Sequence, residues 1–532
     1  MTASSSGPSP RGGSSPFEST AAPPPECPAH AAHGPNSAEG QAASEPAPPK
    51  GRRPVDGLAD LFGTENERDP MGLYERLRAE HGPVAPVQLD GGLHAWLLLG
   101  YRENLEVTRT PSRFSRDSRR WRDLKEGNVA QDSRLLPVVA WQPTCMFADG
   151  ADHERLRGAV TESMGRIDRR GIRRHIMRFT HQLVDEFSTR GKAELVGQFA
   201  EHLPMMVLTH MIGMPEDYSD RMVQASRDLI KGSENAVESN DFVTGTIRQV
   251  VRRKKQEPGR DLASWMLEHR SELSEDEVVQ HLRVVLLTGY ETTANLVANT
   301  LRMVLTDRRF RASLAGGHMT LPDAVEHVLW NEPPLTVVPA RWATGDTELG
   351  GQQIREGEML LLGLGAGNVD PAIRPDIDAP MLGNRSHLAF SSGPHECPGQ
   401  EFGRAITDTG IDTLLMRLPD LHLAVAEDEL DWRASWVSRH LVALPVAFTP
   451  RRRKSDEDAE LLAEPLGGAG LPGPGAAAAT ANGGGTEGRP ASATATATAP
   501  DGGAVAPDGA RVPGQTRRPS LWQVVSEWFR SR

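Results

Sequence analysis

The chain has 532 residues, a formal net charge of −12 and three cysteines, Cys27, Cys145 and Cys397. An acidic chain without a basic, aromatic-interleaved patch is not suited to general nucleic-acid binding. The N-terminus lacks the apolar segment of a signal peptide, and no apolar run reaches the length of about eighteen residues that a transmembrane helix needs. Such sparse cysteines predict reduced thiols and a cytoplasmic protein rather than a disulfide framework.

The two ends of the chain differ in composition from its middle. Residues 1–53 and 451–519 are rich in Ser, Pro, Ala and Gly, as in the run "ASATATATAP". Such segments cannot bury enough apolar surface to offset chain entropy, so we expect two disordered tails. Between them, residues 54–450 predict one folded domain, and a short amphipathic helix is expected at 520–532.

The first elements of the domain are a strand, a turn and a helix in "GGLHAWLLLGYRENLEVTRTPSRFSRD". Helical patterns then dominate from about 153 to 330. Ser274 and Glu277 form a capping-box pattern before a long apolar run. That helix is expected to continue to about Leu305 and, being apolar on most faces, to cross the domain interior. Beyond Pro333 the pattern changes to short strands. The prediction is a mainly helical domain with small sheets.

A loop rich in glycine and proline surrounds the last cysteine, in "FSSGPHECPGQEFGR", Phe390 to Arg404. Glycine and proline make such a loop rigid and leave its backbone accessible. Backbone N–H groups of the loop can then point at the sulfur of Cys397. From the local pattern alone, a plain turn and a ligand-binding loop fit equally well.

This loop resembles the haem-binding loop of the cytochromes P450, F-x-x-G-x-H-x-C-x-G. The fixed positions are met by Phe390, Gly393, His395, Cys397 and Gly399. "TGYETT" resembles the family's A-G-x-[D/E]-T-T, with Thr288 in place of the usual alanine. "DHERLR", "RWATGDTELGG" and "GNVDP" resemble the H-x-x-x-R motif, the strand with the haem-propionate arginine, and the N-R-D-P turn. The resemblance covers about residues 54–450, in family order, and is strongest to soluble actinobacterial members.

The resemblance implies haem b, with Cys397 as the thiolate ligand of its iron. A thiolate opposite the oxygen favours O–O cleavage. It also implies that Thr292 hydrogen-bonds the oxygen, that Glu291 relays protons from solvent, and that Gly289 leaves room for oxygen and substrate. The cations implied to meet the haem propionates are His153, Arg157, Arg341 and His395. The alternatives are an inert buried Cys397, a Thr292 hydroxyl bonded to the previous helical turn, and a surface position for Arg341.

The chain departs from the family at the E-x-x-R motif. The glutamate position falls on His327 and the arginine position on Trp330. The third partner, an arginine before the haem loop, falls on Leu382 or Asn384, with Arg385 nearby. Removing one member of a buried ion network costs roughly 3–5 kcal/mol, whereas replacing every member can be neutral. We therefore expect a neutral cluster of His327, Trp330 and Leu382, as in the minority of actinobacterial members that lack the motif.

The predicted function is a haem-thiolate monooxygenase that inserts one oxygen atom from O2 into an apolar small molecule. The chain has no flavin or nicotinamide domain, so a separate ferredoxin and ferredoxin reductase are expected to supply electrons. Residues 121–139 and 335–339 are expected to line the substrate pocket. Two alternatives stay open: a haem-binding interaction or regulatory protein with weak or no turnover, and a non-monooxygenase haem enzyme such as a phenol-coupling catalyst.

The last thirteen residues, "SLWQVVSEWFRSR", place two tryptophans and a phenylalanine on one helical face. Arginines flank this helix. It is expected to dock on a protein partner or an anionic membrane surface, or else to pack back on the haem domain.

Overall fold

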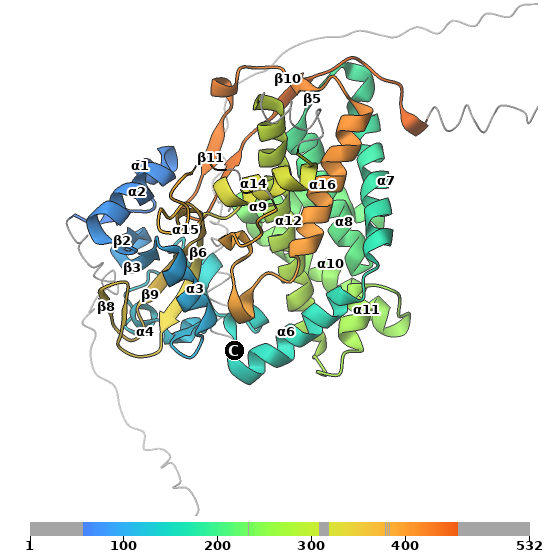
Figure 1. The fold of residues 1–532 in the computed structure, drawn as a ribbon. Helices are drawn as coiled ribbons and strands as arrows, with labels where there is room; N and C mark the ends of the chain where they lie inside the picture. The colour runs from blue at the N-terminus through green and yellow to red at the C-terminus, as the bar shows by residue number, and fades with distance from the viewer. Residues whose placement is uncertain are drawn as a thin grey trace, which may run out of the picture. The chain divides into compact units, whose positions relative to one another are not determined.

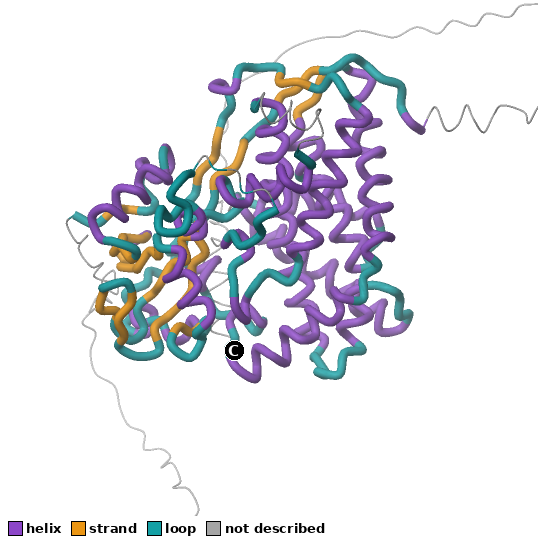
Figure 2. The backbone as a smooth tube through the Cα atoms, in the orientation of Figure 1, coloured by secondary structure: helices purple, strands orange, loops and turns teal. Residues whose placement is uncertain are grey.

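The computed structural model describes residues 57–455, apart from 232, 308–318, 378, 380 and 382. The predicted N-terminal tail, the predicted C-terminal tail beyond residue 455 and the predicted terminal helix lie outside these residues. Helices dominate the described part and the sheets are small, as the sequence predicts (Figures 1 and 2). Within it, none of the helices combines the length and the apolar composition that a membrane span requires.

The helices are, in chain order, α1 (Thr64–Arg68), α2 (Pro70–His81), α3 (Tyr101–Arg109), α4 (Arg122–Lys125), α5 (Leu136–Val139), α6 (Gly150–Gly165), α7 (Arg169–Phe187), α8 (His202–Ile212), α9 (Ser219–Lys231), α10 (Ala236–Gln256), α11 (Leu262–Leu267), α12 (Glu275–Thr306), α14 (Leu321–Asn331), α15 (Leu364–Asn368) and α16 (Gln400–Arg417). The strands are β1 (Ala59–Asp60), β2 (Val84–Leu89), β3 (Leu93–Leu98), β4 (Phe114–Ser115), β5 (Lys192–Glu194), β6 (Val337–Ala343), β7 (Thr347–Leu349), β8 (Gln352–Ile354), β9 (Met359–Gly363), β10 (His422–Leu423), β11 (Trp432–Ala434), β12 (Arg439–Leu441) and β13 (Pro445–Ala447).

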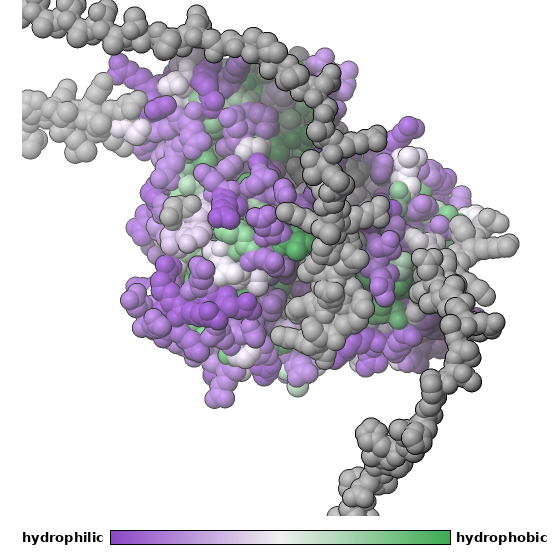
Figure 3. Space-filling model, turned by 180° about the vertical axis from the view of Figure 1, so that it is seen from behind, coloured by the Kyte–Doolittle hydropathy of each residue, from purple (hydrophilic) through white to green (hydrophobic). Residues whose placement is uncertain are grey.

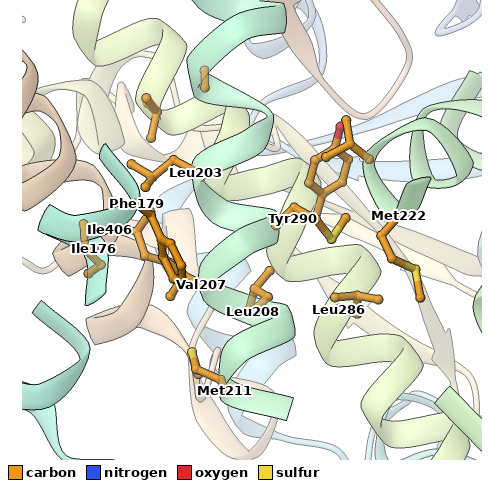
Figure 4. Packing of buried hydrophobic residues seen from close by; sticks show 14 of the residues in the cluster. Ile176, Phe179, Leu203, Val207, Leu208, Met211, Met222, Leu286, Tyr290 and Ile406 are labelled. Carbon is orange, nitrogen blue, oxygen red and sulfur yellow. The ribbon is translucent and has the colours of Figure 1, made fainter. Parts of the chain in front are cut away.

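The long helix α12 is the centre of the helical region. The predicted capping box is present: the Ser274 side chain accepts from the Glu277 N–H, and the Glu277 carboxylate accepts from the Ser274 N–H. The helix ends at Thr306, one residue beyond the predicted end. It contacts α8, α10, α14 and α16, and side chains of α8 and α12 interdigitate in the main core (Figure 4). Because α12 is covered on several sides, its position is fixed by packing.

The largest sheet has the strand order β1-β2-β3-β9-β6-β4 and mixes parallel and antiparallel pairs. Strand β6 pairs antiparallel with β9, but its register shifts between Val338 and Arg341. Three residues of β6 advance where β9 advances two, since Val338 lies opposite Leu362 and Arg341 opposite Leu360. Ala340 has a φ of 77° in this bulge. The extra residue therefore decides to which side of the sheet the Arg341 side chain points.

The described chain continues five residues beyond the predicted domain end at 450. The N–H groups of Lys454 and Ser455 donate to the Asp185 carboxylate, at 2.8 and 3.0 Å, and Arg417 donates to the same carboxylate. Asp185 thus anchors, from α7, the backbone at the end of the described residues. Seen from behind, the described surface is mostly hydrophilic, and its hydrophobic residues gather in recesses (Figure 3).

Candidate functional site

Cys397 lies between the helical turn Gly393–His395 and the first turn of α16. Its own N–H donates to the Phe390 carbonyl oxygen at 2.9 Å, and the Glu396 N–H donates to the Gly393 carbonyl oxygen at 3.0 Å. The N–H of Gly399 donates to the Cys397 sulfur. The loop is therefore closed on itself and presents a partly buried sulfur with a backbone donor.

Gly393 is the position where this loop meets α3. Its φ is 71°, a conformation that glycine adopts without strain. A Cβ at this position would overlap the carbonyl oxygen of Thr108. The glycine that the motif requires here is thus explained by a left-handed turn pressed against a neighbouring backbone.

The protein alone does not make Cys397 a thiolate. Burial raises the pKa of its thiol above the ordinary value, although the Gly399 N–H and Arg157 act in the opposite direction. Metal coordination deprotonates a thiol outright. The sulfur is thus prepared for a metal, and the metal has to complete its deprotonation.

Two arginines lie buried next to the loop. Arg116 is 6% exposed and Arg341 is 2% exposed. Burial lowers the pKa of Arg116 to about 10, and burial together with repulsion from Arg116 lowers the pKa of Arg341 well below its usual value. Among the described residues, Asp149 is the carboxylate whose negative charge attracts both guanidinium groups and partly offsets the fall in their pKa values. It accepts from the Ser115 hydroxyl at 2.5 Å and from the Arg116 N–H at 3.1 Å.

Two histidine rings complete this cluster. The rings of His153 and His395 lie 4.1 Å apart between centroids. In the described part of the chain, the buried His153 Nε2 has no hydrogen-bond partner, and the buried His395 Nε2 has Asp149 Oδ1 at 3.7 Å, beyond hydrogen-bond distance. Burial and the nearby Arg341, only partly opposed by Asp149, lower the pKa of His395 to about 3. Both imidazoles thus present unused polar atoms in the same place as the two arginines.

We name Arg116, Asp149, His153, Arg341 and His395 the cationic cluster. Its buried positive charge exceeds its negative charge, and uncompensated buried charge is costly. An anionic group with several acceptor oxygens removes both this excess and the unpaired nitrogens. The two propionates of a haem have this chemistry, so the residues present fit haem beside Cys397. Arg116 and Asp149 were not predicted from the sequence, because no motif marked them.

Arg157, predicted to meet the propionates, lies elsewhere in the site. Its Nε donates to the Thr161 hydroxyl at 3.0 Å, and its guanidinium donates to the Glu396 carbonyl oxygen in the cysteine loop. The structure therefore brings Arg157 to the loop of Cys397, where it still acts on His153 and helps to lower its pKa, and it brings His153, Arg341 and His395 together.

On α12, Thr292 makes the hydrogen bond that was the alternative interpretation of the sequence. Its hydroxyl donates to the Thr288 carbonyl oxygen at 2.8 Å, and the Thr288 hydroxyl donates to the Val284 carbonyl oxygen at 2.7 Å. The Thr292 oxygen keeps its acceptor capacity. Burial raises the pKa of the neighbouring Glu291, which favours a protonated carboxyl group. The pair can thus hold a proton close to an acceptor.

Gly289 lies where α12 packs against α8. A Cβ there would lie 3.3 Å from both methyl groups of Leu208 on α8. Figure 4 shows Leu208 between α8 and α12. The missing side chain therefore also allows these two helices to approach each other, while the room predicted for oxygen and substrate stays a prediction.

The structure corrects the neutral cluster predicted around Trp330. Trp330 is 1% exposed, and its Nε1–H donates to the Asn384 carbonyl oxygen at 2.8 Å. Arg374 is 4% exposed and lies 5.9 Å from the Trp330 ring centroid. Burial and Arg374 together lower the pKa of His327. A buried cation thus lies in a cluster that was expected to have none; Leu382 is outside the described residues.

Comparison with known proteins agrees with this fold and site. No family model matches the chain. It is 31% identical over 396 residues to the 2-hydroxy-5-methyl-1-naphthoate 7-hydroxylase of Streptomyces carzinostaticus, covering 72% of this chain and 96% of that protein. It is 30% identical over 402 residues to the vitamin D(3) 25-hydroxylase of Pseudonocardia autotrophica, covering 74% and 97%. A solved Streptomyces cytochrome P450 with bound testosterone superposes with a TM-score of 0.68 at 27% identity, covering 74% and 98%.

A mainly helical fold around a cysteine loop and a cationic cluster defines a haem-thiolate protein. The chain belongs to the cytochrome P450 family. It is accordingly a monooxygenase that hydroxylates small molecules, with a haem-thiolate cofactor.

Proposed function

We propose that Cys397 is the iron ligand of this monooxygenase and that the cationic cluster binds the haem propionates. The observation that carries the proposal is the charge imbalance around Asp149, where Arg116 and Arg341 are both buried. Haem, when bound, supplies the activation of O2. Cys397 donates electron density to it, and the loop that contains Phe390, His395 and Gly399 fixes where the sulfur lies.

In this proposal Glu291 and Thr292 deliver protons. The raised pKa of Glu291 keeps a proton on its carboxyl group at higher pH than an exposed glutamate would. Thr292 orients the proton acceptor through its hydroxyl oxygen. Electrons come from a ferredoxin and its reductase, in keeping with the family's use of separate redox partners. The substrate is an apolar small molecule, and the cytoplasmic location stays a prediction.

We also propose that the chain lacks a working E-x-x-R pair. His327 and Trp330 occupy its positions, and neither is charged in the way the motif requires. The geometry that supports this is the Trp330 hydrogen bond to Asn384 together with the stacking of buried Arg374. Arg374 also donates to Asn331 at 2.8 Å, so an arginine joins the same two segments from a different position.

The test of the ligand is Cys397→Ala, with Cys145→Ala as the matched control because both thiols are buried or partly buried. The reduced carbon-monoxide difference spectrum distinguishes a thiolate-ligated iron from other haem proteins. We expect Cys397→Ala to lose the thiolate band and Cys145→Ala to keep it. A thiolate band that survives in Cys397→Ala would refute the assignment.

The test of turnover starts from a screen of apolar compounds by the shift in haem spin state. Compounds that bind are then incubated with a surrogate ferredoxin and reductase, or with peroxide. A hydroxylated product is expected. Binding without product from either oxidant system would instead favour the interaction or regulatory role. A coupled phenol product would favour the third interpretation.

A further inference from the structure

A buried ion network, which we name the Glu326 network, joins α14 to both ends of the cysteine loop. Glu326 on α14 is 3% exposed. The Arg404 Nε donates to its Oε1 at 2.6 Å, and the His387 Nε2 lies 2.9 Å from its Oε2. Arg404 follows the loop on α16 and is 6% exposed; His387 precedes the loop and is 5% exposed. One carboxylate thus holds the residues on either side of Cys397.

The hydrogen bonds of His387 indicate which of its ring nitrogens donates. Its Nδ1 accepts from the Ala389 N–H at 3.2 Å, so the proton of the neutral ring is on Nε2, which donates to Glu326. Burial raises the pKa of Glu326, but the hydrogen bonds from His387 and Arg404 more than offset this and bring it below the ordinary value. The network therefore pairs one ionised carboxylate with one guanidinium, and both carboxylate oxygens are used.

Arg404 also contacts the loop itself. Its guanidinium carbon lies 4.6 Å from the centroid of the Phe390 ring, and the His387 ring lies 5.7 Å from the same ring. Phe390 in turn accepts the Cys397 N–H through its carbonyl oxygen at 2.9 Å. A continuous series of contacts thus leads from Glu326 through Arg404 and Phe390 to the backbone of the cysteine.

Trp330 adds an independent contact to the same network. Its ring meets the His387 ring edge-on, at 5.8 Å between centroids and 90° between planes. Arg385, by contrast, is 55% exposed and lies 3.4 Å from Glu326. An exposed ion pair contributes little, so Arg404 and His387 are the partners that matter.

We propose that Glu326, acting through Arg404 and His387, is the positioning residue that sets the Cys397 loop for thiolate ligation. The position lies one residue before the one at which the family motif would place its glutamate. Nothing in the E-x-x-R pattern identifies it. The inference rests on the proposed ligation of iron by Cys397.

The experiment uses the full-length haem protein and compares four variants: Glu326→Gln, Arg404→Lys, the double variant Glu326→Gln/Arg404→Gln, and Arg417→Gln. The last is the control, because Arg417 also lies on α16 and pairs with a half-buried acid, Asp185, at 2.8 Å but far along the helix from the loop. Two quantities are measured on folded protein: the melting temperature, and the fraction of haem with the thiolate band in the reduced carbon-monoxide spectrum.

We expect Glu326→Gln to lower both quantities, with the thiolate fraction falling by about twofold or more, because Arg404 loses its counter-charge. Arg404→Lys keeps the charge but loses the fork and the stacking on Phe390, so it should fold and still lose thiolate band. Arg417→Gln should lower the melting temperature and leave the band unchanged.

The double variant separates positioning from charge compensation. It removes the buried charge and should recover melting temperature while its thiolate fraction stays low. Recovery of the band as well would overturn the proposal, and so would a full band in Glu326→Gln and Arg404→Lys. If Glu326→Gln does not fold, the thiolate fractions of Arg404→Lys and of the double variant test the proposal instead. A failure of the underlying ligation is recognised separately, since Cys397→Ala would then keep its band.

Discussion

The cationic cluster and the Glu326 network are both buried groups of charges beside the same loop, yet they differ in completeness. In the Glu326 network the carboxylate, the guanidinium and the imidazole satisfy one another. In the cationic cluster two guanidinium groups face one carboxylate. In the described part, His153 Nε2 has no hydrogen-bond partner and His395 Nε2 has only Asp149, at 3.7 Å. A complete network stabilises the protein by itself, whereas an incomplete one does so only together with its ligand.

The largest effect is expected for breaking the complete network in the haem-free protein. Glu326→Gln should lower the free energy of unfolding by about 3–5 kcal/mol, because Arg404 loses its buried counter-charge and keeps only the exposed Glu401. Urea titration of the apoprotein measures it. Glu401→Gln is the control, since Glu401 is 45% exposed and contacts Arg404 at 3.5 Å; it should cost about 1 kcal/mol or less. Equal losses in the two variants would remove the distinction between the networks.

The opposite sign is expected in the incomplete cluster. Arg341→Met removes a buried charge whose guanidinium donates a long hydrogen bond, 3.3 Å, to the Ala340 carbonyl oxygen. The apoprotein should gain about 1–4 kcal/mol in free energy of unfolding, while haem leaves the variant faster. Urea titration and the rate of haem transfer to an excess of an apo-globin measure the two changes. An apoprotein that is destabilised while its haem retention is unchanged would contradict this account.

Glu291 gives a pH-dependent test of an unpaired buried acid. Burial raises the pKa of Glu291 in the folded protein above its ordinary value of 4.5. At a pH between 4.5 and the raised pKa, the protein therefore takes up a proton on this carboxyl group when it folds. As the pH rises above about 4.5, the apoprotein should therefore lose stability relative to Glu291→Gln. The free energy of unfolding should fall by at most about 1.4 kcal/mol per pH unit, and the loss should level off above the raised pKa. Below about pH 4.5 the difference should vanish. A difference that is constant across this range would show that burial does not act on this carboxyl group.

The smallest effect is expected at His327. A glutamate there meets buried Arg374, which already lowers the pKa of the histidine. His327→Glu should therefore be neutral or raise the free energy of unfolding by about 1 kcal/mol, with His327→Gln as the uncharged control. Thermal melting of the two variants is the measurement. A clear loss of stability in His327→Glu alone would restore the neutral cluster expected from the sequence.

The features predicted correctly are local in the chain. The capping box of α12 needs Ser274 and Glu277 alone, and the Cys397 loop is specified within ten residues around its glycines. The features missed join distant residues of ordinary type. Glu326 meets Arg404 across 78 positions, and Arg116 is buried against β6 across more than 200. No short pattern carries such pairs. The contact of Gly289 with Leu208 on α8 is likewise one that no local pattern shows.

The bulge in β6 has a consequence for how this enzyme can change. Residues 335–339, predicted to line the substrate pocket, precede it, and Arg341 of the cationic cluster follows it. The pairs of Arg341 and Trp342 with β9 fix the second half of the strand whatever the first half carries. Substitutions made to alter substrate choice can thus accumulate before Ala340 without turning the arginine away from the cofactor. In this strand, substrate specificity and cofactor binding can therefore change separately, both in evolution and in a designed library of variants.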